Sequence, residues 1–152
     1  MKGTALRIVV GYALAVCAAY LVGCIVVSQG NIASVVALGF DVTLSQRIDS
    51  AVHDIINMTA IYLPLIAVAF LIALPVSALV ISRVPHLKRL GYVLGGCVAL
   101  IAIHVILKMV LGLSGVAPTR TIAGLLAQGL AGAVGGYCYY RAITWRQAVA
   151  PS

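Results

Sequence analysis

Four polar side chains stand within or beside long apolar runs, and their residue types are the ones that could carry chemistry. His104 and Lys108 lie one helical turn apart in one run, Gln128 lies midway along another, and Asp54 precedes a third. Ionisable and amide groups at such positions are typical of a polar path for an ion or a small solute. The structural alternative is that Lys108 extends its long side chain to the membrane interface and Gln128 bonds to another helix.

Two of these residues are expected at a similar depth in the membrane. Counted from Leu90, His104 lies about 21 Å and Lys108 about 27 Å along its run if the run is helical. Asp54, at the start of a different apolar run, stands at a similar depth. We therefore formulate the hypothesis of an ion pair between Asp54 and Lys108.

The residue patterns that catalysis and cofactors require are missing. All three acidic residues fall between positions 41 and 54, and there is no Glu. No His or Cys spacing fits zinc, no phosphate loop occurs, and only His104 lies deep enough to bind haem. The sequence predicts no enzyme, no catalytic residue, no metal and no cofactor.

The composition identifies lipid as the surroundings of most of the chain. Of 152 residues, 63% are hydrophobic and only 9% are charged, and the mean hydropathy is +1.15. One crossing needs roughly 20 apolar residues. We predict an all-α integral membrane protein with one membrane domain, a bundle of four transmembrane helices. The expected spans are about 7–28, 55–82, 90–113 and 120–141, followed by a short cytoplasmic tail, 142–152.

The segment between the first two spans, about 31–54, is expected to be interfacial and extracytoplasmic. Its second half, "DVTLSQRIDSAVHDIIN", places Leu44, Ile48 and Val52 on one helical side and polar residues on the other. Thr43 and Gln46 fit a capping box. No Gly or Pro interrupts Thr43 to Leu63, so we expect this amphipathic helix to continue into the second span, either straight or with a bend where it enters the lipid.

Basic residues indicate the orientation. Two basic residues lie in the connections expected on the extracytoplasmic side, Arg47 and Arg120. Seven flank the other ends of the spans: Lys2, Arg7, Arg83, Lys88, Arg89, Arg141 and Arg146. This asymmetry predicts a plasma (inner) membrane protein with both termini in the cytoplasm. Because these residues sit at the ends of apolar runs, we expect them to contact lipid headgroups and not nucleic acid.

Small residues recur at helical spacing and predict close helix packing. In the first span they are Gly11, Ala15, Ala19 and Gly23. The third span begins with Gly91 and Gly95, and the fourth carries Gly124, Gly132 and Gly136 on the face that also holds Gln128. Two interpretations stay open for these faces, contact between helices of one chain and self-association of two chains.

Two further features admit more than one interpretation. Leu21 to Cys24 resembles a lipoprotein processing site, but the apolar residues after Cys24 favour an uncut first span. Pro64 and Pro75 fall inside the second expected span, where each would cause a kink, act as a hinge or expose a carbonyl to an ion.

The leading interpretation is a non-catalytic, multi-pass membrane subunit. It would act through helix packing, with the lipid bilayer, itself or another membrane protein as partners. The alternative is a small transporter or channel with a polar path through Asp54, His104, Lys108 and Gln128. The sequence does not identify the partner, the substrate or the oligomeric state.

Overall fold

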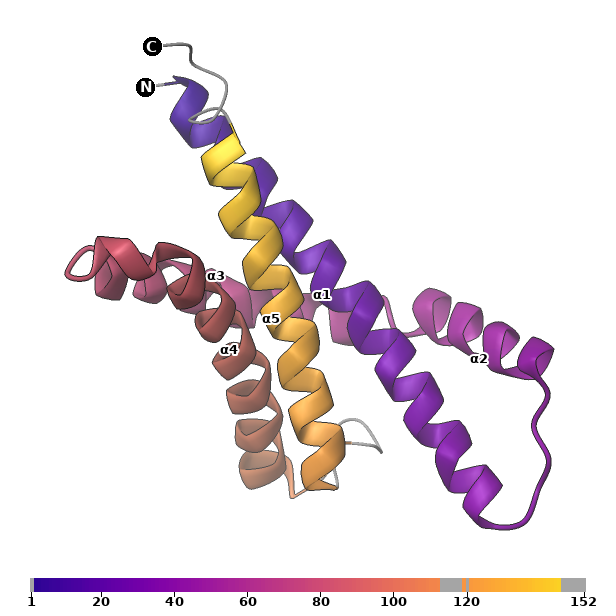
Figure 1. Cartoon of the computed structure of the whole chain (residues 1–152). Coiled ribbons are helices and arrows are strands. Elements are labelled where there is room, and N and C mark those ends of the chain that lie inside the picture. The colour runs from indigo at the N-terminus through magenta and orange to yellow at the C-terminus, as the bar shows by residue number, and fades with distance from the viewer. Residues whose placement is uncertain (1, 113–118, 120, 146–152) are drawn as a thin grey trace.

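The structure is a computed structural model that describes the chain except residues 1, 113–118, 120 and 146–152 (Figure 1). The described residues form helices and no strand, so the all-α prediction is confirmed. The elements are α1 (Lys2–Ala37), α2 (Leu44–Asn57), α3 (Tyr62–Ile81), the short 3-10 helix η1 (Pro85–Leu87), α4 (Lys88–Leu111) and α5 (Ile122–Thr144). Four helical stretches are long and apolar enough to cross a membrane: Thr4–Ala37, Tyr62–Ile81, Pro85–Val110 and Ile122–Thr144.

Helix α1 extends well beyond the expected end of the first span near residue 28. It has 36 residues, which corresponds to about 54 Å, whereas a bilayer core is about 30 Å thick. No proline interrupts it, and Ser34 Oγ bonds to the carbonyl of Gly30 within the same helix. The helix ends where Gly39 adopts a φ of 91° and donates its N–H to the carbonyl of Val36.

The capping box at the start of α2 is confirmed. The backbone N–H of Gln46 donates to Thr43 Oγ1 at 3.3 Å, and the backbone N–H of Thr43 donates to Gln46 Oε1 at 2.8 Å. The side of α2 with Leu44, Ile48 and Val52 is exposed.

The expectation that the amphipathic helix continues into the second span, straight or bent, is wrong. Helix α2 ends at Asn57, and α3 begins only at Tyr62 after a turn. Pro64 explains the break, because it has no N–H for the carbonyl of Ala60 and its ring would clash there. Pro64 thus lies in the first turn of α3, where proline is tolerated, and Pro75 lies inside the helix.

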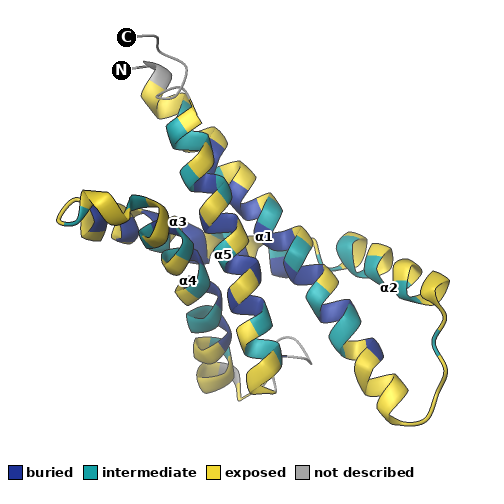
Figure 2. Ribbon diagram, in the orientation of Figure 1, coloured by how far each residue is buried: buried dark blue, intermediate teal, exposed yellow. Residues whose placement is uncertain are grey.

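The long helices pack in antiparallel pairs, with α5 lying between α1 and α4 (Figure 1). Helix α3 contacts both α4 and α1, and α2 contacts α1. The first turn of α1 and the last turn of α5 lie at the same end of the molecule. Buried residues line the facing sides of α1, α5 and α4, whereas α2 has none (Figure 2).

Candidate functional site

Glycine allows the backbones of α4 and α5 to meet. A Cβ added at Gly96 would lie 2.2 Å from the carbonyl oxygen of Gly132, and one added at Gly136 would lie 2.0 Å from that of Tyr92. Only a residue without a side chain fits at such distances. Gly132 and Gly136, two of the expected packing residues, therefore face a helix of the same chain.

The small-residue face of α1 packs against the other side of α5. Gly11 faces the ring of Tyr139, and Ala15 and Ala19 are fully buried beside Gly135. Gly23 lies against the hydroxyl of Tyr62. The sequence pattern did not single out Gly135, because it lies one position outside the stripe that faces α4.

The other predicted packing glycines have different neighbours. Gly91 faces the side chain of Ile81, and Gly95 faces Ser77, so both lie towards α3. Gly124 is half-buried in the first turn of α5, where its N–H donates to Thr121 Oγ1 at 3.0 Å. In the structure, Gly124 therefore contributes to the N-terminal cap of α5.

Gln128 is the centre of a buried polar contact between three helices. Its Oε1 accepts a hydrogen bond from the Tyr62 hydroxyl at 2.5 Å, and its Nε2 donates to the carbonyl of Gly23 at 3.2 Å. Both Gln128 and Tyr62 are almost fully buried. The amide thus finds its partners on α1 and α3 of the same chain, as the structural interpretation of Gln128 expects.

His104 extends this cluster towards α4. Its ring lies edge-on to the ring of Tyr62, with the centroids 5.9 Å apart, and its Nδ1 is 2.7 Å from the carbonyl oxygen of Leu100. Its Nε2 is buried and has no hydrogen-bond partner. Sequence analysis found His104 and Gln128 but missed Tyr62, the residue that connects them. A tyrosine at the start of an apolar run was the available signal.

Tyr20 joins α1 to the turn before α3. Its hydroxyl donates to the carbonyl of Ile55 and lies 3.0 Å from Thr59 Oγ1. Cys24 is fully buried one turn further along α1, in the middle of the continuous helix. A lipid attached to its sulfur would have no room in this fold.

The structure does not pair Asp54 with Lys108, although it describes both residues. The ion pair of Asp54 is with its neighbour His53, at 3.5 Å. Lys108 is exposed, while His104 and Gln128 are buried. Tyr62 therefore brings His104 and Gln128 together, and the described contacts include none that joins these two to Asp54 or Lys108.

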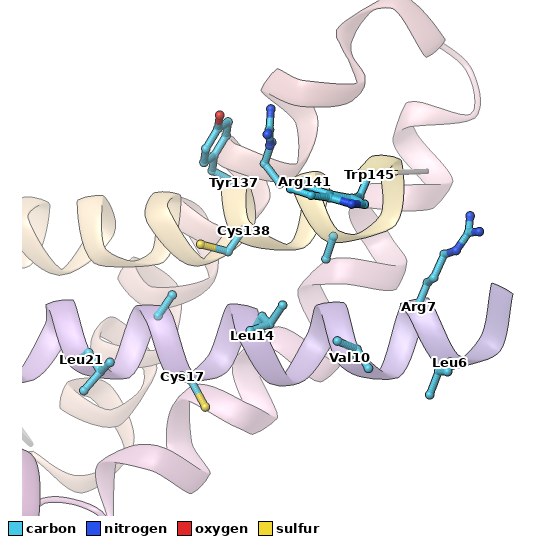
Figure 3. Close-up of a pocket in the computed structure, with 12 residues that line it drawn as sticks. Leu6, Arg7, Val10, Leu14, Cys17, Leu21, Tyr137, Cys138, Arg141 and Trp145 are labelled. Atoms are coloured by element: carbon cyan, nitrogen blue, oxygen red, sulfur yellow. The ribbon is translucent and has the colours of Figure 1, made fainter. Parts of the chain in front are cut away.

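Two grooves lie outside the polar cluster. One, of about 780 Å³, runs between α1 and α5, and Figure 3 shows the residues along it. The other, of about 280 Å³, lies between α3 and α4. Neither groove is lined by Tyr62, His104 or Gln128.

Among the described residues, no three His, Cys, Asp or Glu side chains group as metal ligands do. The buried hydroxyl and amide of the cluster bond to each other and to the backbone. Comparisons of the chain with protein-family models, with curated proteins and with solved structures found no match.

Proposed function

We propose that the four apolar helices cross the plasma membrane as a bundle and that the protein is a non-catalytic membrane subunit. It associates with itself or with a larger membrane complex. In this proposal the first turn of α1 and the last turn of α5 face the cytoplasm, and α2 lies on the opposite side of the membrane. The excess of basic residues at the cytoplasmic ends supports this orientation.

The groove between α3 and α4 is the observation that carries this proposal. Small side chains from both helices line it: Ala69, Ala73 and Ser77 from α3, and Gly95 and Ala99 from α4. Helices in lipid associate where small residues allow their backbones to approach closely. A transmembrane helix of a partner can therefore dock here.

The glycine faces are poorer candidates for this role. The faces of α5 that carry Gly132 and Gly135 are already covered by α4 and α1. The α3–α4 groove combines small residues with open space between helices and has no charged residue in its lining. Association through it leaves the internal contacts of the chain intact.

The test fills the groove. Ala73→Leu and Ala102→Leu each add three carbon atoms to its lining, and Ala13→Leu adds the same atoms on the exposed surface of α1. Tagged and untagged copies are expressed together, purified in a mild detergent, and weighed by native mass spectrometry. We expect the wild type and Ala13→Leu to exceed the mass of one 15.7 kDa chain, and the groove variants to fall to it.

Two results would contradict this proposal. One is a wild-type protein that remains a single chain both in mild detergent and after cross-linking in its native membrane. The other is groove variants that retain the complex. An added mass of one or more whole chains indicates self-association, an added mass of lipid size indicates bound lipid alone, and the mass of another polypeptide indicates a different membrane protein.

A small transporter or channel is the second candidate, and the buried, unpartnered Nε2 of His104 favours it. Such an atom in a membrane protein is expected to meet water or a solute on a polar path. Cysteines placed at 104, 108 and 128, in a chain without its native cysteines, test this path. Labelling of all three by a membrane-impermeant thiol reagent would reject the subunit proposal in favour of transport.

A further inference from the structure

The groove between α1 and α5 is apolar along most of its length and carries basic residues towards one end. Val10, Leu14 and Leu21 of α1 are exposed along it, and Cys138 lines it from α5. Arg7 stands at its outer end on α1, and Arg141 stands on α5 about one helical turn closer to its middle, since its neighbour Ala142 lies against Gly11 (Figure 3). A cavity of about 780 Å³ is large enough for a ligand of considerable size.

The length of the groove matches one leaflet of a bilayer. From Arg7 to Leu21, α1 rises about 21 Å. Half of a bilayer, with its hydrocarbon and its headgroups, is about 20–22 Å thick. If Arg7 lies among the headgroups, Leu21 therefore lies near the middle of the membrane.

No acidic side chain accompanies the arginines at this end of the groove. The three acidic residues all lie between positions 41 and 54, beyond the other end of the groove. A second copy in the same orientation would bring its own arginines to this depth and add positive charge. The complementary occupant is a molecule with an acidic head and long apolar chains.

We propose that this groove binds one anionic phospholipid of the cytoplasmic leaflet. Its acyl chains lie along the apolar length, and its headgroup lies at the outer end, where the long side chains of Arg7 and Arg141 reach it from the two helices. The Arg141 guanidinium carbon lies 5.9 Å from the centre of the Trp145 ring, which suits a site at the headgroup level. This inference rests on the membrane crossing proposed above, but not on the docking of a partner helix to α3 and α4.

Native mass spectrometry of the full chain with equal amounts of phosphatidylglycerol and phosphatidylcholine tests the selectivity. A basic residue beside an anionic lipid surface contributes about 1 kcal/mol, so each arginine that contacts the bound headgroup should give about a fivefold preference. We expect the first lipid bound to be phosphatidylglycerol, with a preference on the order of twentyfold for two arginines. Equal binding of the two lipids would overturn the proposal.

A pair of double variants locates the preference. Arg7→Gln with Arg141→Gln removes both charges at the groove, and we expect the two lipids then to bind about equally. The control, Arg83→Gln with Lys88→Gln, removes the same net charge at sites outside the groove and should keep the preference. If the groove variant keeps the preference, or the control loses it, the arginines at the groove do not select the lipid.

The wild-type chain offers a second measurement that does not depend on the variants folding. Cys17 is exposed and lines the groove, whereas Cys97 lies between α4 and α5, beside Gly129. Phosphatidylglycerol should slow the reaction of Cys17 with N-ethylmaleimide and leave that of Cys97 unchanged. Equal protection of Cys17 by phosphatidylcholine would indicate unselective surface lipid and contradict the proposal. A failure of either test leaves the α3–α4 docking proposal unaffected.

Discussion

Replacement of Gly96 by alanine is expected to separate α4 from α5. The added Cβ would lie 2.2 Å from the carbonyl oxygen of Gly132, whereas ordinary van der Waals contact begins at 3.4 Å. The neighbouring atoms belong to the backbone, so no side chain can rotate away. The two helices must therefore move apart by roughly 1 Å, the difference between those distances.

The cost follows from the contacts that this movement weakens. A gap of 0.5–1 Å loses about a quarter to a half of the attraction of each atom pair. Overpacked interiors lose about 1–3 kcal/mol, and a backbone clash favours the upper value. Alanine regains about 1 kcal/mol because it stabilises a helix better than glycine does. The net loss is about 2 kcal/mol, or roughly a thirtyfold change in the folding equilibrium.

Reversible unfolding by SDS added to detergent micelles, followed by circular dichroism, measures this loss. Gly11→Ala is the matched control, because its Cβ would lie 3.2 Å from Tyr139 Cδ2, and a small shift relieves that contact. Because the control gains the same helix propensity and its contact is relieved by a small shift, we expect it to be as stable as the wild type or up to about 1 kcal/mol more stable. If Gly96→Ala unfolds at the same SDS fraction as Gly11→Ala, the glycine contact does not hold α4 to α5.

Three further predictions concern polar residues. Gln128→Leu should destabilise the fold by about 1–2 kcal/mol, because it leaves the Tyr62 hydroxyl buried without a partner. Adding Tyr62→Phe to this variant should restore part of the lost stability in the same SDS titration. Thr43→Ala should lower the stability of α2 by about 1 kcal/mol, because it removes the cap of that helix. Amide hydrogen exchange in the first turn of α2 should become faster, while exchange in α5 stays unchanged. Exchanging the charges, Asp54→Lys with Lys108→Asp, should give the sum of the two single effects within about 0.5 kcal/mol, and a larger rescue would reveal an ion pair.

Local patterns in the sequence predicted the elements well. The apolar runs gave the long helices, since an uninterrupted run of that length has few other stable forms in lipid. The capping box of Thr43 and Gln46 was predictable because its partners lie three residues apart. The break before α3 was missed, since the proline that causes it stands after the break, at position 64.

Contacts between distant residues were harder to predict. The sequence indicates how deep Asp54 and Lys108 lie along their helices. Whether their side chains face each other also depends on how each helix is rotated about its axis, which the sequence does not show. Tyr62 and Gln128 are 66 positions apart, and their hydrogen bond depends on how α3 and α5 are turned towards each other. Gly135 and Gly136 are neighbours, yet they face α1 and α4 respectively.

The length of α1 has a mechanical consequence. Gln29 and Arg47 are joined by a 3.2 Å hydrogen bond, and Ser28 Oγ donates to Ser50 Oγ at 2.9 Å, so α2 is fastened to the far half of α1. A helix longer than the hydrocarbon is thick responds to a thinner bilayer by leaning further over. In the membrane crossing proposed above, α2 would tilt together with α1, so a change in bilayer thickness would change the depth of α2 at the membrane surface.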